Sequence, residues 1–575
     1  MRRFLTTILM AVLVASMAAP SFAGDKNKKK KDATAPVVSA DPQQAAKDRI
    51  VDAIFYQEAK LVEDMHKYTP IVETYIQNLK HDDELGEVPA SDAYFLGRLV
   101  LNEKGIKDAE YTKHKSNMTW RVLDRLNKFW QMNYLPLGFM QLVVLNNNFD
   151  RDHYDLSFLR QQFIGEVRTL VFDVSPKPHQ KGVHFRGRIW VEDKDYHIVR
   201  FNGTYEPRTQ TNFFFHFDTW RENLQPGLWL PAYVYTEESD AKYMLIRRLA
   251  MKGQTRLWGY DLKHSGRSSE MTAIEIDPSD QIADKSDKSA NEWNPVQSQH
   301  MWQREAEDNV LDRLERAGMI APDSDVSKVL QTVVNNLEIT NKLSIDPDVR
   351  ARVLLTMPLE SFTVGHTIVI SRGLLDVLPD EASLAMVLAH ELGHISLGHQ
   401  IDTRYSFSDR LIFPDETTFR QFDLTRKENE EEEADKKAEE FLANSPYKDK
   451  LQNAGLFLKQ MQERAPALKY LITPHFGNRM AKKDDILRMA NLMQKSPQLE
   501  VKDVKQVAAL PLGSRIHLDA WDDHVEMKKT GAPVFESARD KMPLEVTPAF
   551  PNLVRFGDAP PAVKSAQNEG PKPNQ

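Results

Sequence analysis

The sequence predicts an α+β protein in which an antiparallel, β-rich domain with a helical N-terminal part precedes a mainly helical domain with a small sheet. Residues 48–68 carry apolar side chains at helical spacing, which indicates a helix. Residues 186–192 and 197–201 alternate apolar and polar side chains around a short turn, which indicates a hairpin. The length of 575 residues leaves room for two or three domains.

The N-terminus predicts a secretory signal peptide of residues 1–23. Arg2 and Arg3 precede an apolar run that ends near Ala19, and Ser21-Phe22-Ala23 supplies small residues for cleavage after Ala23. We therefore expect a periplasmic or secreted protein, with residues 24–44 as a basic, flexible leader. The lysines of that leader oppose translocation, so an uncleaved anchor is the alternative interpretation.

Residues 45–276 are predicted to form the helical and then β-rich domain. The strand pattern begins after about residue 135 and continues through 212–217 and 228–236. This pattern faintly resembles the lipoprotein-carrier half-barrels of bacterial envelopes, which implies peripheral membrane or lipoprotein contact. Its aromatic residues fit a core better than a ligand pocket.

A polar linker over residues 277–294 leads into the second domain, expected at 295–500. There we expect helices at 302–317, 326–340 and 479–493, and a strand at 362–370. Two final segments complete the predicted organisation: an extension over 501–556 and a Pro-rich, disordered tail over 557–575.

The motif His390-Glu391-Leu392-Gly393-His394 has the spacing of a zinc site on a helix. Residues four apart share one helix face, so both imidazoles can reach one ion. Glu391 lies about 100° around the helix from His390, which suits a general base better than a ligand. Asp380, after Pro379, is the expected N-cap of this helix.

A third metal ligand must come from another segment. Gln400 and Leu397 stand where the longer HExxHxxGxxH pattern has histidine and glycine, so that class is excluded. His399 lies about 180° from His390 on a continuous helix and is expected in a loop or on the surface. Glu431 instead shares a helix stripe with small and apolar residues, and Asp435 one turn later can orient a ligand histidine.

These motifs resemble the gluzincin metallopeptidases of the HtpX and CAAX-prenyl-protease group (metallopeptidase family 48), which includes periplasmic quality-control proteases. The resemblance covers about residues 301–492 and rests on HExxH, the ExxAD helix from Glu431 to Asp435 and the segment 361–375. It implies one Zn²⁺ per chain, held by His390, His394 and Glu431, with Glu391 as the catalytic base.

Two further segments have open interpretations. Family members often place His-Pro several residues before an arginine, whereas this chain reads Thr473-Pro474-His475-Phe476-Gly477-Asn478-Arg479. His475 and Arg479 are candidates for a fourth ligand or an oxyanion donor, or they belong to an ordinary loop. Residues 405–419 are either a lid over the metal or a packed loop.

Composition narrows the function further. The chain has no cysteine, hence no disulfide and no nucleophilic thiol, and its net charge of -8 argues against general nucleic-acid binding. We expect a zinc metalloendopeptidase that cleaves unfolded or misfolded envelope proteins in quality control. The alternative is a periplasmic chaperone or a lipid- or lipoprotein-binding protein whose protease domain is regulatory or latent.

Overall fold

The fold was taken from a computed structural model of the whole chain. The residues that the structure describes are 42–83, 86–102, 105–110, 142–145, 148–206, 215–243, 247–260, 295–399, 424–474, 476–477, 481–482, 485–486, 488–501, 516–518, 525–527, 544, 546, 548–549 and 551–557. Contacts within the chain divide it into two units, Met1–Ile50 and Val51–Gln575. The predicted signal peptide, the linker at 277–294, the lid segment at 405–419 and the tail beyond 557 lie outside the described residues.

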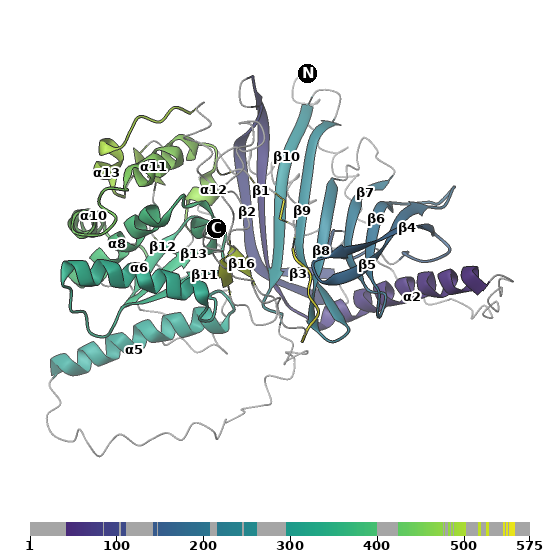
Figure 1. The fold of residues 1–575 in the computed structure, drawn as a ribbon, viewed down its shortest axis with the longest axis horizontal. Helices are drawn as coiled ribbons and strands as arrows, with labels where there is room; N and C mark the ends of the chain where they lie inside the picture. The colour runs from purple at the N-terminus through teal and green to yellow at the C-terminus, as the bar shows by residue number, and fades with distance from the viewer. Residues whose placement is uncertain are drawn as a thin grey trace, which may run out of the picture. The chain divides into compact units, whose positions relative to one another are not determined.

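The class is α+β, with a large antiparallel sheet and a helical region that has its own small sheet (Figure 1). The large sheet has ten strands in the order β3-β2-β1-β10-β9-β8-β7-β6-β5-β4. Its strands are β1 (Ile71–Asp82), β2 (Gly86–Asn102), β3 (Gly105–Glu110), β4 (Tyr154–Ile164), β5 (Val167–Pro176), β6 (His184–Glu192), β7 (Ile198–Glu206), β8 (His216–Gln225), β9 (Leu228–Tyr243) and β10 (Arg247–Trp258).

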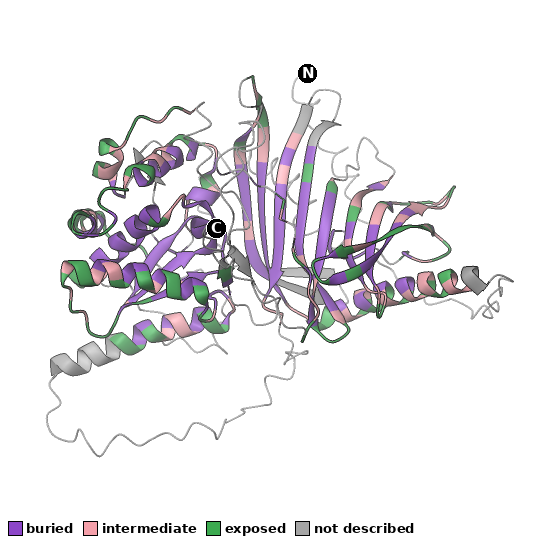
Figure 2. Ribbon diagram, in the orientation of Figure 1, coloured by how far each residue is buried: buried purple, intermediate pink, exposed green. Residues whose placement is uncertain are grey.

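The predicted hairpin of residues 186–201 is present as β6 and β7, but the prediction that strands start only after residue 135 was wrong. Strands β1 to β3 occupy 71–110. The first seven residues of β1 are all buried, so this strand lacks the alternation that marks a half-exposed strand (Figure 2). Strand β9 also starts where 228–236 predicted one, whereas β8 begins at His216, near the end of the segment 212–217.

Helix α2 (Pro42–Asp64) is followed by a short 3-10 helix η1 (Met65–Lys67), and its part from Val51 onward packs against one face of the sheet. Arg221 of β8 donates two hydrogen bonds to Glu58 of α2, at 2.7 and 2.8 Å, and both side chains are 1% exposed. Aromatic rings also pack together within the sheet domain, from Phe185, Phe201, Tyr205 and Phe217. These rings therefore build a core, as expected.

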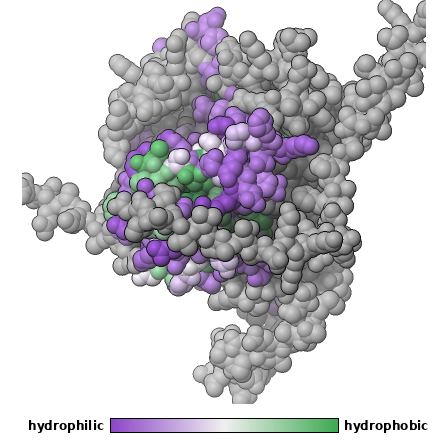
Figure 3. All heavy atoms as spheres, turned by 90° about the vertical axis from the view of Figure 1, so that its right-hand side faces the viewer, coloured by the Kyte–Doolittle hydropathy of each residue, from purple (hydrophilic) through white to green (hydrophobic). Residues whose placement is uncertain are grey.

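The far edge of the sheet is strand β4, which exposes three large apolar side chains, Phe158, Leu159 and Phe163. Apolar surface gathers within a border of hydrophilic side chains in the view of Figure 3. A register shift between Phe158 and Arg160 marks a bulge in this edge strand. Such bulges discourage pairing of an edge strand with other chains.

The helical region surrounds a three-stranded sheet in the order β11-β13-β12. Its elements are α5 (Pro295–Arg316), α6 (Asp325–Asn341), β11 (Arg350–Leu354), β12 (Ser361–Val364), β13 (Thr367–Ser371), α7 (Arg372–Val377), α8 (Glu381–Leu397), α10 (Glu428–Ala443), α11 (Gln452–Arg464), α12 (Lys469–Ile472), β14 (Ala481–Lys482), β15 (Asp485–Ile486) and α13 (Ala490–Lys495). The helices expected at 302–317 and 326–340 are present as α5 and α6. No helix among the described residues is long and apolar enough to span a bilayer.

Two expectations for this region were wrong. Residues 362–370 are not one strand, because Gly365 at φ 57° turns the chain between β12 and β13. A glycine adopts this left-handed conformation without strain, so the hairpin closes there. The helix expected at 479–493 is reduced to α13, and the described residues before it form the short pair β14 and β15.

Buried polar groups join strands β1 and β2 to the helical region. Asp92 of β2 accepts hydrogen bonds from the backbone N–H groups of Tyr470 and Leu471 in α12, at 3.0 and 2.8 Å, and from the Tyr75 hydroxyl at 3.3 Å. Burial raises the pKa of Asp92 to about 7, although these donors act to lower it. Glu73 of β1 accepts from Met357 N, and burial likewise raises its pKa.

The residues expected as an extension include the strand pair β16 (Ile516–Leu518) and β17 (Val525–Met527) and then an extended stretch ending at Gly557. This last stretch, yellow in Figure 1, is bound to the ten-stranded sheet: Val546 N donates to Gln77 of β1 at 2.8 Å, and Ala549 N donates to the Tyr233 hydroxyl of β9 at 3.2 Å.

Candidate metal centre

Helix α8 carries both motif histidines through the core. Asp380 is its N-cap, as predicted, and accepts from Ser383 N at 2.8 Å. Every residue from Ala382 to His394 is buried. Gly398, at φ 71°, ends the helix in a left-handed C-cap, so the residue after it leaves the helical path. The helix therefore supplies a buried, rigid support for His390 and His394.

Helix α10 carries Glu431 and packs directly against α8. The buried residues of α10 are Glu431, Ala434, Ala438, Phe441 and Leu442, while Glu432 and Glu433 are exposed. The burial pattern agrees with the stripe expected from the sequence. Gly393 allows the close approach, because a Cβ there would lie 2.8 Å from the Ala434 carbonyl oxygen.

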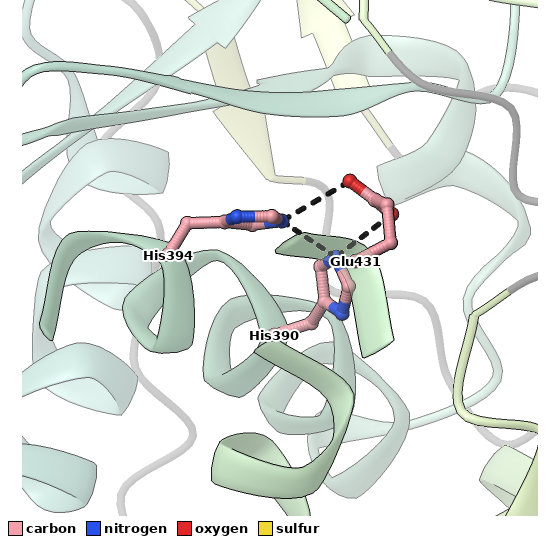
Figure 4. Close-up of side chains that lie close together, drawn as sticks. All are labelled: His390, His394 and Glu431. Carbon is pink, nitrogen blue, oxygen red and sulfur yellow. Dashed lines mark hydrogen bonds and ion pairs between the residues drawn. The ribbon is translucent and has the colours of Figure 1, made fainter. Parts of the chain in front are cut away.

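The three candidate ligands converge on one point (Figure 4). His390 Nε2 and His394 Nε2 are 3.1 Å apart, and they lie 3.4 and 3.2 Å from the two Glu431 carboxylate oxygens. A tetrahedral zinc ion with bonds of about 2.0–2.1 Å separates its ligand atoms by roughly 3.3–3.4 Å. The donor set, its spacing and its burial thus fit one zinc ion.

Outer hydrogen bonds fix the histidine rings. His390 Nδ1 lies 2.7 Å from Asp435 Oδ1, and the other carboxylate oxygen accepts from Met489 N at 2.7 Å. His394 Nδ1 lies 2.9 Å from His399 Nδ1, and His399 Nε2 lies 3.3 Å from Glu433. His399 thus lies in a loop, one of the two places expected for it, and the cap at Gly398 turns it back onto His394.

Glu391 points into a buried hydrogen-bond cluster beside the ligands. Its Oε1 accepts from Ser361 Oγ at 2.7 Å and from Arg488 Nη1 at 2.9 Å. Arg488 also donates through Nε to Glu431 Oε2 at 3.0 Å. A single guanidinium thus holds the candidate base and the candidate third ligand together.

The electrostatics of the cluster keep Glu431 ionised. Burial raises the pKa of its carboxyl, but the charge of Arg488 and hydrogen bonds from His390 and His394 lower it more, so the net pKa is well below the usual range. Burial and Arg488 lower the pKa of His390, but hydrogen bonds with Asp435 and Glu431 raise it overall. Burial lowers the pKa of His394 and favours the neutral imidazole that binds metals.

The edge strand of the small sheet lies next to this cluster. Ser361 opens β12, and its carbonyl oxygen accepts from Arg488 Nη2 at 3.5 Å. Two residues later, the Thr363 carbonyl oxygen accepts from Arg426 Nη2 at 3.2 Å. Two backbone acceptors of this buried edge strand are therefore paired with arginine donors, and Ser361 at its start also contacts Glu391.

Not every candidate residue can be placed. The structure brings His390, Glu391, His394, Glu431 and Asp435 together, whereas His475 and Arg479 fall outside the described residues. Arg488 was not anticipated. No spacing in the sequence distinguishes it from other arginines, since it reaches the site from a segment far from both metal helices.

Comparison with known proteins finds a family match for one part of the chain. Residues 324–411 match the model of peptidase family M48. The matched segment contains His390, Glu391 and His394 and stops before Glu431, so the third position of the site rests on the geometry described above. No curated protein matches the chain.

Proposed function

Because residues 324–411 place this chain in peptidase family M48, a family of metallopeptidases, we propose that it is a zinc-dependent metalloendopeptidase. The carrying observation is the convergence of His390, His394 and Glu431 beside the buried carboxylate of Glu391. The proposed arrangement of the peptidase domain is that of the gluzincins, in which a glutamate on a second helix is the third ligand.

In the proposed reaction, bound zinc supplies a Lewis acid that polarises the scissile carbonyl and lowers the pKa of water. Glu391 takes the proton of the attacking water and then delivers it to the leaving amine. Arg488 and Ser361 hold the Glu391 carboxylate in place at 2.9 and 2.7 Å, so the base needs no reorganisation before it acts. Asp435 fixes the tautomer of His390.

The edge of β12 supports a substrate that binds in an extended conformation. Its carbonyl oxygens at Ser361 and Thr363 face donors from Arg488 and Arg426, and substrate N–H groups can replace those donors by adding a strand. Backbone pairing of this kind selects unstructured polypeptides more than particular side chains. With the predicted signal peptide, it favours unfolded proteins of the envelope or secreted space as substrates, in quality control.

The decisive experiment is cleavage of casein by the zinc-loaded wild type and by Glu391→Gln, each with and without a chelator. We expect Glu391→Gln to bind zinc but to lose activity by about 10³-fold, within the range that a general base contributes. Glu381→Gln, at the exposed first residue of the same helix, is the matched control and should cleave like the wild type.

Retained cleavage by Glu391→Gln would contradict the assigned base. Inactive, zinc-loaded wild type would favour the alternative, in which the protease domain is latent and the sheet domain acts as a chaperone or carrier.

A further inference from the structure

We call residues 544–557 the crossing segment. The structure describes its residues 544, 546, 548–549 and 551–557. None of its described residues belongs to a helix or strand, and backbone hydrogen bonds connect it to the ten-stranded sheet domain. Leu544 starts it in a left-handed turn, at φ 62°, and Pro548 and Pro551 favour an extended chain and cannot donate hydrogen bonds. The described part of the crossing segment is thus held through its backbone, as a bound peptide is.

It lies on the face of the sheet opposite α2. Arg221, which contacts α2, lies over the ring of Phe201, and Phe201 pairs with Thr219 of β8, so Trp220, next to Thr219, points to the opposite face. Trp220 pairs with Tyr233 of β9, and register pairs lead from there through Arg256 to Glu73 of β1. Glu73, Tyr75 and Gln77 alternate along β1 on that same face.

The sheet contacts the backbone of the crossing segment and not only its side chains. The Gln77 amide donates to the Leu544 carbonyl at 2.6 Å and accepts from Val546 N at 2.8 Å. The Tyr233 hydroxyl accepts from Ala549 N at 3.2 Å. A side-chain amide that pairs with one residue's C=O and another's N–H recognises the backbone and no particular side chain.

The far end of the crossing segment is held at the turns of the sheet. Glu166 N donates to the Leu553 carbonyl at 2.9 Å, and Asn223 Oδ1 accepts from Phe556 N at 2.8 Å. A Cβ at Gly165 would lie 2.5 Å from the same Leu553 carbonyl. The glycine therefore leaves the space that the passing backbone occupies.

Side chains of the crossing segment add affinity for the sheet and restrict which sequences can bind there. Leu544, Val546 and Leu553 are at most 3% exposed, so aliphatic groups anchor the segment at both ends. Arg555 pairs with Glu192 at 2.8 Å and with Asp193 at 2.9 Å. An occupant of this face therefore needs two aliphatic residues two positions apart at one end, and at the other end an aliphatic residue followed two positions later by a basic residue.

We propose that this face of the sheet is a binding site for an extended polypeptide with aliphatic anchors and a basic residue, and that the crossing segment fills it in cis. The site is separate from the metal centre, and its occupancy does not depend on the proposed peptidase activity. A polypeptide bound in trans must displace residues 544–557, which compete at the high effective concentration of a tethered ligand.

The test uses the full chain carrying Glu391→Gln, which prevents cleavage, and a fluorescent peptide with the sequence of residues 543–557. The added pair Val546→Asp and Leu553→Asp weakens docking in cis. We expect the peptide to bind this released protein at least about tenfold more tightly than the protein with an intact segment, measured by fluorescence anisotropy. Equal affinity for the two proteins would overturn the proposal.

A matched pair of glycines identifies the site. Gly165 and Gly227 both have positive φ, at 59° and 69°, but a Cβ at Gly227 meets nothing within 4 Å. In the released protein, Gly165→Ala should weaken peptide binding by about tenfold or more, because it adds a clash of a kind that costs over 1 kcal/mol. Gly227→Ala adds the same backbone strain but no clash, so it should leave peptide binding unchanged. Equal effects of both substitutions would place the peptide elsewhere.

A second measurement tests the proposal even if the released variants do not fold. In the protein with only Glu391→Gln, excess peptide should speed hydrogen exchange at the amides of Val546, Ala549 and Phe556, which the sheet protects. Reduced, carboxymethylated lactalbumin, an unfolded polypeptide, should do the same. Unchanged exchange with both probes means that the face accepts only its own tethered segment, and the proposal fails.

Discussion

Glu431 in the metal centre and Asp92 in strand β2 are both buried carboxylates, yet their surroundings have opposite effects. Arg488 and two histidines hold the pKa of Glu431 well below its usual range, whereas burial raises the pKa of Asp92 to about 7. Glu431 faces cationic groups, while Asp92 faces neutral N–H and O–H donors. Neighbouring charge, more than burial, thus separates a cation-binding carboxylate from one that joins two parts of the fold.

The largest expected effect is on zinc binding. Glu431→Ala removes a buried metal ligand. Loss of a hydrogen-bond partner outside the ligands costs roughly 10- to 100-fold in metal affinity, so zinc affinity should fall here by more than that. Zinc content and affinity can be measured by titration against a chromogenic chelator. Glu432→Ala, exposed on the same helix, is the control, and equal losses in both would refute Glu431 as the third ligand.

The second prediction concerns Asp92. Its folded pKa of about 7 lies above the usual 3.8, so the folded state binds a proton more tightly than the unfolded state. Stability contributed by this group is therefore greatest at low pH and falls as pH rises from about 4 to about 7. Relative to Asp92→Asn, the wild type should lose roughly 4 kcal/mol over that window, at 1.36 kcal/mol per pKa unit.

Urea unfolding of both proteins at several pH values measures this difference directly. A difference that stays constant with pH would show that Asp92 keeps an ordinary carboxyl group, and the contrast with Glu431 would disappear.

The third prediction concerns the cation that distinguishes the two carboxylates. Arg488→Met leaves the candidate metal ligands intact but frees the Glu391 carboxylate that Arg488 holds at 2.9 Å. We expect kcat to fall by about 100-fold, the lower end of what a positioned base contributes, with zinc retained. Arg488→Lys should recover part of the activity. A protein without zinc would instead show that Arg488 is needed to build the site.

The smallest effect is expected at Asp435. Asp435→Asn keeps the shape of the side chain but removes the charge beside His390 Nδ1, so zinc affinity should fall by roughly 10-fold. Competition with a chelator measures it. A loss as large as that of Glu431→Ala would mean that Asp435 does more than orient a ligand.

Local sequence signals predicted most of the metal centre. The cap at Asp380, the spacing of His390 and His394, and the stripe through Glu431 are all set within one or two helices, where periodicity determines direction. The burial along α10 agrees with that stripe. The turn at Gly365 was missed, although a glycine that interrupts a β-branched run is a local signal for a turn.

Features that depend on distant packing were not predictable. Arg488 and His399 reach the site through a separate segment and a helix cap, and neither has a periodic signal. Strand β1 is buried along its first seven residues, so it shows no alternation, and Asp92 has its role only because α12 lies against it. The crossing segment looked like a simple extension because its partners are strands hundreds of positions earlier.

The contact at Gly393 changes how the motif itself should be read. The second unspecified letter of HExxH is not free in this protein, because a Cβ at Gly393 would lie 2.8 Å from the Ala434 carbonyl oxygen and would force a shift of α10, which carries Glu431. A residue that cannot touch an ion is thus as restricted as those that can.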